Sequence, residues 1–277
     1  MPELPEVETV CRGLRPHLVG RTLTGVRATS ARLRRASDVA AIERATVGRA
    51  VMDVRRRGKY IVVEFSGGTA LLLHLGMTGA MRVCKSEAPR LKHEHVVWTL
   101  DNGAEWRFTD PRRFGSVVVC VLPAVGADPC ELRDLGCEPL SPQFSARSLY
   151  AATRERRKPI KNLLMDQAVV AGVGNIYANE ALFGAGVRPE RAAAGLTEAE
   201  CRRLVRAVKQ VLRRAIRAGG TTISDFQAPD GSAGRFHVEL AVYGRAGLPC
   251  RRRGCRGKVR RTVQAGRSTY HCPKCQR

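Results

Sequence analysis

Four cysteines near the C-terminus have the spacing of a metal site. They follow the pattern C-x4-C-x16-C-x2-C, in basic, turn-like sequence that is too polar to build its own core. Two close pairs separated by roughly 15–20 residues form a tetrahedral zinc site, because four thiolates at about 2.3 Å satisfy Zn²⁺. Coincidence and disulfide bonding are the alternatives. We predict one structural zinc ion, with no coordination position open for catalysis, bound by Cys250, Cys255, Cys272 and Cys275.

The N-terminus offers a second possible chemistry. If Met1 is removed, Pro2 presents a secondary amine. An α-amino group has a pKa near 8, against about 10.4 for lysine, so far more of it is unprotonated and nucleophilic at neutral pH. Glu3 is the adjacent candidate for acid–base work. Taken alone, however, a proline and acidic residues are common at the start of a helix.

The charge predicts a polyanionic partner. The chain has 277 residues and a formal net charge of +23, and nearly half of this excess lies in the last 33 residues, which hold 11 basic and no acidic side chains. Nucleic acid is the first candidate and an anionic membrane surface the second. A general bias toward arginine is the alternative, since only 8 of the 48 basic residues are lysines. The clustering favours a phosphate-binding module.

The first half of the chain reads as a helix followed by short strands. Pro5–Leu18 carries an apolar stripe at helical spacing. Asn102-Gly103 between two strand-like runs predicts a two-residue hairpin. Many short strands without intervening helices predict an antiparallel sandwich or barrel-like domain. The expected strands are Thr22–Ala28, Val51–Arg55, Tyr60–Phe65, Ala70–Leu75, Val96–Leu100, Glu105–Thr109 and Ser116–Leu122.

The second half is helical from Ser145 onward, after a proline-rich linker. Thr197 to Glu200 forms a capping box, which opens a helix with an apolar face and a run of arginines. A solvated surface is favoured over a DNA-reading one for that run. Gly219 and Gly220 end the helix and begin a long loop, of the kind that serves as a functional lid or is disordered. No apolar run is long enough to span a membrane, and no secretory signal is visible.

The opening, Met1-Pro-Glu-Leu-Pro-Glu-Val-Glu-Thr9, resembles the start of the formamidopyrimidine-DNA glycosylase family. Seven further motifs occur in the family's order, so the resemblance covers essentially the whole chain. They are Arg56-Arg-Gly-Lys-Tyr60, His74-Leu-Gly-Met-Thr-Gly79, Thr109-Asp-Pro-Arg-Arg-Phe-Gly115, Ala171-Gly-Val-Gly-Asn-Ile-Tyr-Ala178, Gly219-Gly-Thr-Thr222, Val242-Tyr-Gly-Arg245 and the cysteine pattern.

The resemblance implies a bifunctional enzyme of base excision repair. It excises oxidised purines, chiefly 8-oxoguanine and formamidopyrimidines, from duplex DNA through a Pro2 Schiff base, and nicks the abasic site by β,δ-elimination. Glu3 protonates the sugar ring oxygen and Glu6 supports the site. Lys59 acts at the reacting nucleotide and in β-elimination, and Arg267 assists δ-elimination. Without the family, Lys59 is an exposed cation in a hairpin.

The resemblance also implies a set of DNA contacts. Met77, Arg112 and Phe114 match the side chains that fill the gap left by the flipped nucleotide. Asn175 caps a helix beginning at Ile176, the second helix of a helix–two-turn–helix, and clamps phosphates with Lys161. The remaining expected contacts are His74, His93, Arg157 and Tyr243.

The expected architecture is α+β, in four parts. Residues 1–132 form a β-sandwich-like catalytic domain with an N-terminal helix, and 133–144 a linker. Residues 145–240 form the helical domain, with a lesion-capping loop at 219–234, and 241–277 the zinc finger. We expect a cytoplasmic, DNA-associated monomer with no membrane contact, acting on damaged double-stranded DNA.

Two other functions stay open. One is a glycosylase of the endonuclease VIII type, which prefers oxidised pyrimidines. That branch typically opens Met-Pro-Glu-Gly-Pro-Glu, so Leu4 favours the purine branch. The other is a zinc-stabilised DNA-binding protein without catalysis, against which the intact Pro2, Glu3 and Lys59 argue. Thr78, where serine is frequent in the family, and the C-x4-C arm are the departures from the family pattern.

Overall fold

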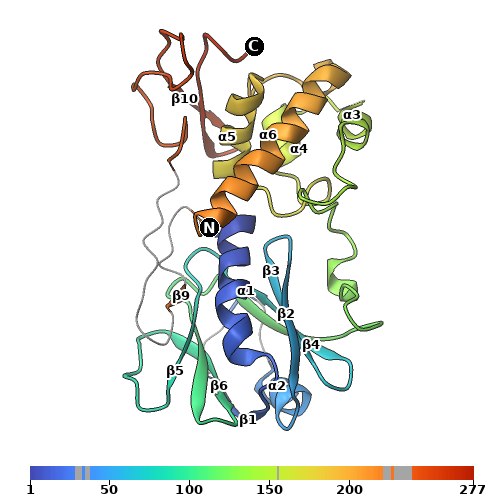
Figure 1. The fold of residues 1–277 in the computed structure, drawn as a ribbon, viewed down its shortest axis with the longest axis vertical. Helices are drawn as coiled ribbons and strands as arrows, with labels where there is room; N and C mark the ends of the chain where they lie inside the picture. Colours follow the sequence, from blue (N-terminus) through green and yellow to red (C-terminus); the bar gives the residue numbers. More distant parts are fainter. Residues whose placement is uncertain (29–32, 35–37, 155, 221–225, 228–238) are drawn as a thin grey trace. The chain divides into compact units, whose positions relative to one another are not determined.

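The computed structural model describes residues 1–277 except 29–32, 35–37, 155, 221–225 and 228–238. The chain divides into two compact units. The first comprises Met1–Asp134 with Gly219–His237, and the second comprises Leu135–Ala218 with Val238–Arg277. Strands dominate the first unit and helices the second, so the predicted α+β class is confirmed (Figure 1).

Two sheets build the first unit. One has the order β1-β6-β7-β5-β9, namely Leu23–Ala28, Glu94–Leu100, Ala104–Thr109, Ala80–Lys85 and Phe226–Gln227. The other has the order β2-β3-β4-β8, namely Val51–Arg57, Tyr60–Phe65, Thr69–His74 and Ser116–Val121. Neighbours are antiparallel except β5 and β9. Side chains from both sheets share one core, which includes Trp98 stacked on Trp106 at 4.0 Å between ring centroids.

Helix α1 (Leu4–Leu18) packs its apolar stripe into that core. Val7, Val10, Leu14 and Leu18 are buried there beside residues of both sheets, as the helical spacing predicts. Pro5 lies in the first turn, where backbone N–H groups have no acceptor within the helix, so the missing N–H of proline costs no hydrogen bond. The predicted helix is confirmed, and it begins one residue earlier than expected.

The expectation that no helix interrupts the strands is wrong. Helix α2 (Val39–Thr46) follows β1, with the Asp38 carboxylate accepting the Ala40 N–H at 3.0 Å and Ile42 buried in the core. Strand β5 was also not expected. Only Met81 and Val83 of its six residues are buried, so its apolar signal is short.

The second unit contains helices and one small hairpin. The helices are α3 (Ala146–Thr153), α4 (Ile160–Leu164), α5 (Asn175–Ala185) and α6 (Glu198–Arg217), and the hairpin joins β10 (Arg260–Gln264) to β11 (Arg267–His271). Short 3-10 helices occur at Cys130–Leu132, in the first unit, and at Ala193–Gly195.

The predicted boundaries of α6 are confirmed. Thr197 and Glu200 form the capping box, and Gly219 and Gly220 both have left-handed φ angles beyond the C-terminus. The predicted apolar side chains of α6 are buried except Val211, which is half-buried. The loop expected at 219–234 lies outside the described residues, apart from 219, 220 and the backbone of Phe226–Gln227, which pairs with β5. Among the helices that the structure describes, none is long and apolar enough to cross a bilayer.

Candidate active site and nucleic-acid interface

The start of α1 buries Pro2 and Glu3. Glu3 is the N-cap residue of the helix, and its side chain is only 3% exposed. The Glu6 carboxylate accepts the Glu3 backbone N–H at 2.9 Å, which fixes the chain directly after Pro2. The supporting role expected for Glu6 therefore has a physical basis. A carboxyl beside the chain terminus is in position for proton transfer to a bound group.

Lys59 occupies the turn between β2 and β3. Gly58 has a φ of 58° at the first turn position, where a tight hairpin needs a left-handed residue. Turn side chains are usually solvated, but Lys59 is 6% exposed. Arg56 donates to the Gly58 carbonyl at 3.2 Å and pairs with Glu8 of α1 at 3.0 Å. The turn that carries Lys59 is thus fastened to α1.

His74 lies at the end of β4, opposite Tyr60 of β3. Burial, together with the positive charges of Lys59 and Arg34, lowers the pKa of His74 to about 4, so the imidazole is neutral at pH 7. The His74 Nδ1 accepts the Gly76 N–H at 3.0 Å. Its proton is therefore on Nε2, which is a neutral donor suited to an anionic oxygen.

The three side chains expected to fill the DNA gap are exposed together. Met77 is 41% and Phe114 43% exposed, and the exposed Arg112 guanidinium lies 4.9 Å from the Phe114 ring centroid. Gly76 has a φ of 62°, and a Cβ there would come within 2.4 Å of the Phe114 backbone. The turn bearing Met77 therefore packs directly on the segment bearing Phe114. Core burial of Met77, the ordinary interpretation of that residue, is excluded.

Asp110 organises this exposed cluster, and the sequence analysis did not single it out. It is fully buried, and its carboxylate accepts the Thr78 hydroxyl at 2.6 Å, the Gly115 N–H at 2.7 Å and the Arg112 N–H at 3.3 Å. Charge-assisted bonds of this kind fix loop geometry. The signal in the sequence was the Asp-Pro pair after a strand, which also fits an ordinary turn.

In the second unit, Lys161 and Asn175 both reach β11. Lys161 is fully buried and donates to the Thr269 hydroxyl at 2.6 Å and the Ser268 carbonyl at 3.1 Å. Asn175 Nδ2 donates to the same Ser268 carbonyl at 3.0 Å. The expectation that Asn175 caps a helix starting at Ile176 is wrong, because α5 begins at Asn175 with Gly174 as its N-cap.

Two further residues of α5 hold the C-terminal segment and were missed in the sequence. The buried Glu180 accepts the backbone N–H groups of Ala241, Val242 and Tyr243 at 2.7, 2.9 and 2.9 Å. Asn179 accepts the Tyr270 N–H at 2.7 Å. A periodic apolar pattern gives no signal for buried polar residues of this kind.

The other expected contact residues are accessible to different degrees. Arg157 and Arg267 are exposed, and Arg267 begins β11. Tyr243 is half-buried, with its ring 5.0 Å from that of Tyr270. His93 is half-buried with a left-handed φ of 69°. The expected residues thus form two groups, one in each unit.

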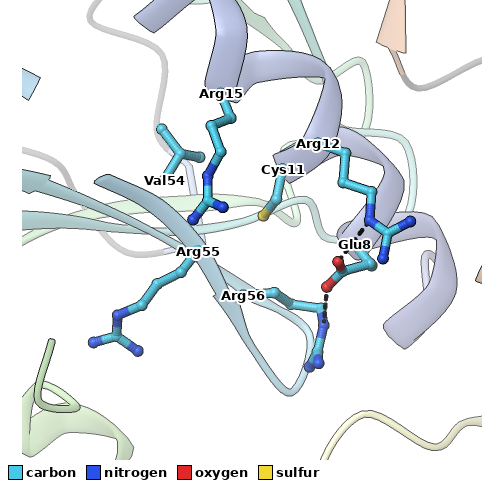
Figure 2. A pocket seen from close by; sticks show the side chains of 7 residues that line it. All are labelled: Glu8, Cys11, Arg12, Arg15, Val54, Arg55 and Arg56. Atoms are coloured by element: carbon cyan, nitrogen blue, oxygen red, sulfur yellow. Dashed lines mark hydrogen bonds and ion pairs between the residues drawn. The ribbon is translucent and has the colours of Figure 1, made fainter. Parts of the chain in front are cut away.

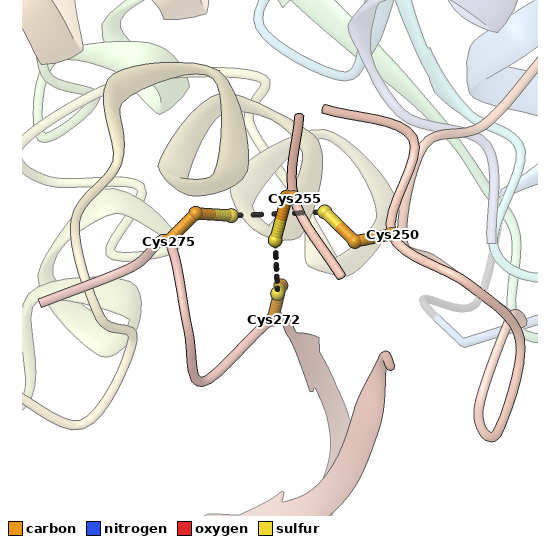
Figure 3. A group of neighbouring side chains, drawn as sticks. All are labelled: Cys250, Cys255, Cys272 and Cys275. Carbon is orange, nitrogen blue, oxygen red and sulfur yellow. Dashed lines mark hydrogen bonds between the residues drawn. The ribbon is translucent and has the colours of Figure 1, made fainter. Parts of the chain in front are cut away.

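The four C-terminal cysteines come together as the spacing predicts (Figure 3). Their sulfur atoms lie within 4.8 Å of one another, and the Cys250–Cys275 and Cys255–Cys272 sulfurs are 3.7 Å apart. Four thiolates at 2.3 Å from a central ion have sulfur atoms about 3.8 Å apart, whereas a disulfide requires about 2.05 Å. The cluster therefore fits a tetrahedral ion and excludes disulfides.

The backbone around the sulfur atoms also fits a metal. The Arg252 and Gly257 N–H groups each donate to a cysteine sulfur at 3.4 Å, to Cys250 and Cys255 respectively. A Cβ at Gly257 would lie 2.7 Å from the Cys272 sulfur, so the thiolates fill the space that a side chain would need. The six remaining cysteines are also free thiols.

A cavity of about 220 Å³ between α1 and β2 carries no comparable chemistry (Figure 2). It is lined by Arg12, Arg15, Arg55 and Arg56, and each of these pairs with a carboxylate. Cys11 also lines it, and burial raises the pKa of that thiol to about 12. The thiol is therefore not ionised at neutral pH and is a poor nucleophile.

Comparison with known proteins matches one family model to each of the two units. The model of the formamidopyrimidine-DNA glycosylase N-terminal domain matches residues 1–117, and that of the H2TH domain of the same enzymes matches residues 135–227. A formamidopyrimidine-DNA glycosylase of Thioalkalivibrio sulfidiphilus is 51% identical over the full length of both chains.

Solved structures give the same result. The crystal structure of MutM (Fpg) from Thermus thermophilus is 42% identical with a TM-score of 0.82, covering 99% of this chain and 98% of its own. Lactococcus lactis Fpg in complex with DNA containing N7-benzyl-Fapy-dG is 34% identical with a TM-score of 0.89, and each chain is fully covered. The chain therefore belongs to the formamidopyrimidine-DNA glycosylase family.

Proposed function

We propose that this glycosylase removes oxidised purines from duplex DNA and then cleaves the abasic strand. The observation that carries the proposal is the burial of Glu3 and Lys59 where helix and hairpin sequences usually expose them. Buried ionisable side chains are costly, and they cluster at catalytic sites. The Lactococcus lactis relative has solved complexes with DNA containing N7-benzyl-Fapy-dG and with DNA containing an oxidised pyrimidine, so the purine preference proposed here rests on Leu4 and on the test below.

Pro2 supplies the nucleophile once Met1 is removed. Glu3 first protonates O4′ of the damaged nucleotide as the C1′–O4′ bond breaks, and the Pro2 nitrogen attacks C1′. The nitrogen then passes its own proton to the base, and its lone pair forms the C1′=N bond of an iminium as the bond from C1′ to the base breaks. Base release therefore needs Glu3, and Glu6 accepts the backbone N–H of Glu3 and so fixes the chain directly after Pro2.

Strand cleavage follows from the iminium, which acidifies the neighbouring carbon. Loss of a C2′ proton expels the 3′ phosphate as the C3′–O bond breaks, and loss of a C4′ proton then expels the 5′ phosphate as the C5′–O bond breaks. We assign Lys59 to the first elimination and Arg267 to the second. The Schiff base is hydrolysed at the end, which returns the Pro2 amine.

The exposed cluster of Met77, Arg112 and Phe114 serves base flipping. Two apolar side chains and a planar guanidinium are suited to replace a base in the stack. Neutral His74, together with His93, Arg157, Tyr243 and the Lys161–Asn175 pair, contributes to phosphate binding. Because Lys161 and Asn175 both bind Ser268, we infer that they also position β11 and the side chain of Arg267, the residue before Ser268.

The four thiolates hold one structural Zn²⁺ in this proposal. Zinc prefers sulfur ligands in tetrahedral geometry, and the apolar cluster around the cysteines is small: it includes Cys250 and Cys272 themselves and depends on Phe183 of α5. A filled four-sulfur shell keeps the ion out of the reaction. We also propose that the protein acts as a monomer.

The test uses three duplexes, with 8-oxoguanine opposite cytosine, thymine glycol, or an abasic site. We expect wild-type protein to release 8-oxoguanine faster than thymine glycol and to nick the product strand. Glu3→Gln should lose base release but still incise the abasic duplex measurably, because the Pro2 amine remains. Glu43→Gln, an exposed carboxylate of the same unit, is the matched control.

Each alternative predicts a different result. Preferential release of thymine glycol indicates an enzyme of the endonuclease VIII type. Tight binding of undamaged DNA without nicking of any duplex indicates a non-catalytic DNA-binding protein. Equal loss of both activities in Glu3→Gln assigns Glu3 to structure or to the lyase step.

A further inference from the structure

The C-terminal three turns of α6 present an uninterrupted basic surface. We name Arg206, Lys209, Arg213, Arg214 and Arg217 the α6 basic face; all are exposed except Lys209, which is half-buried. Four of them and Gln210 line a shallow hollow of about 410 Å³. Their separations of three, four and seven residues place the hollow along one side of the helix.

These arginines differ from the two at the start of the same helix, whose charges are paired. At the start of the same helix, Arg202 pairs with Glu198 at 3.6 Å and Arg203 with Glu200 at 3.9 Å. Within the described part of the chain, no carboxylate pairs with any member of the α6 basic face. Elsewhere in that part, carboxylates pair with Arg12, Arg15, Arg55, Arg56, Arg57, Arg82, Arg107, Arg188 and Arg191.

Such a face opposes the stability of its own helix. Like charges three or four residues apart repel one another, as Lys209 and Arg213, and Arg213 and Arg217, do here. Lys209 donates to the Ser141 carbonyl at 2.8 Å, which leaves its charge uncompensated. A bound polyanion removes this repulsion, whereas water only screens it.

The surroundings of α6 decide which polyanion fits. An amphipathic basic helix binds a membrane through its apolar side, but the apolar side of α6 is buried against α3 and α5 (Figure 1). Protein partners need apolar or aromatic anchors, and none of the large exposed apolar side chains of the described chain lies on α6. Guanidinium groups that match phosphate oxygens in a row of like charges favour a phosphodiester backbone.

We propose that the α6 basic face binds the phosphate backbone of duplex DNA, as a contact separate from the residues of the lesion site. It recognises no base and no damage, because its side chains are phosphate-binding groups without an apolar wedge. This contact goes beyond the proposed function and does not depend on Pro2 chemistry. It holds the protein on undamaged DNA.

The test is the salt dependence of binding to an undamaged duplex, measured by fluorescence anisotropy. The variant R206Q/R213Q/R217Q should lower the magnitude of the slope of log K against log salt by about 2.7, at about 0.9 for each phosphate that is no longer neutralised. The matched control R133Q/R188Q/R202Q removes the same charge from exposed arginines that are already paired, and should lower the slope by less than about 0.9. Glutamine forms helix about as well as arginine, and circular dichroism checks that α6 is intact.

Three results would overturn the proposal. The first is an equal slope change in both triple variants, which makes the effect one of net charge. The second is loss of the slope in the lysine variant R206K/R213K/R217K, in which the charges persist. The third is that R206Q/R213Q/R217Q binds DNA like wild type but loses binding to phosphatidylglycerol vesicles or polyglutamate.

Single-turnover base release from a short lesion duplex should be unchanged in R206Q/R213Q/R217Q. If wild type releases no base while the slopes differ as expected, the proposed function fails and this contact stands.

Discussion

Gly257 has no space for a side chain beside the cysteine sulfurs. A Cβ there would lie 2.7 Å from the Cys272 sulfur and 3.3 Å from the Cys255 sulfur, while ordinary contact begins near 3.4 Å. In Gly257→Ala the Cys272 sulfur must therefore move by about 0.7 Å. Metal–ligand distances tolerate deviations of about 0.2 Å. We expect metal affinity to fall by about a hundredfold or more, which is about 2.8 kcal/mol of binding free energy.

The assay is competition for the metal with a chromophoric chelator, together with metal analysis of the purified protein. Wild-type protein should hold one zinc ion per chain, and Cys272→Ser should release it. Gly195→Ala is the matched control, because a Cβ at Gly195 meets nothing within 4 Å and the residue is outside the left-handed region. Wild-type stoichiometry and chelator midpoint in Gly257→Ala would refute the inference that these sulfurs surround an ion.

Three further predictions concern single side chains. His74→Ala should weaken DNA binding about two- to tenfold through loss of one neutral hydrogen bond, and a salt slope reduced by about 0.9 would show instead that His74 carries charge. Hydrogen bonding by Arg191 lowers the pKa of Glu200 from the usual 4.5 to about 2. The ionised Glu200 therefore stabilises the fold fully above pH 4.5, and this contribution is lost as the pH falls toward 2. The difference in unfolding free energy between wild type and Glu200→Gln, measured by urea melts, should shrink over that range, and a constant difference contradicts the ion pair. Thr78→Val should lower the free energy of unfolding by about 1.5–3 kcal/mol, because it breaks the hydrogen bond to Asp110, and it should slow base release. Thr78→Ser should retain wild-type stability and base release. Equal behaviour of the two variants excludes that hydrogen bond as the cause.

Local signals in the sequence predicted the elements that position the site. The capping box at Thr197 and the glycines after α6 act through neighbouring backbone atoms, so they need no tertiary information. The Asn102-Gly103 signal located the hairpin between β6 and β7, but the predicted two-residue turn is wrong, because Asp101, Asn102 and Gly103 form a three-residue loop in which Gly103 alone has a left-handed φ, of 79°. The cysteine spacing was equally local, because two short arms approach one ion. Periodicity located α1 for the same reason.

Tertiary contacts account for what the sequence could not predict. The burial of Lys59 depends on a turn that Arg56 fastens to α1, and no pattern around Lys59 indicates it. The fully buried amine of Lys161 binds Ser268 and Thr269, more than 100 residues away, and no local pattern indicates these contacts. Asp110 gathers its donors from two loops. Pairings of this length become visible only when the chain has folded.

The most direct test of the proposed chemistry is reductive trapping on 8-oxoguanine DNA. While Met1 is attached, the Pro2 nitrogen is a tertiary amide, with no proton and no available lone pair. Borohydride added during turnover should reduce the iminium and join protein to DNA, and peptide mapping should find the sugar on the nitrogen of Pro2 in a chain that lacks Met1. An uncleavable N-terminal extension should preserve DNA binding and abolish trapping. A crosslink on Lys59, or trapping by the extended protein at the wild-type rate, would contradict the assignment of Pro2 as the nucleophile.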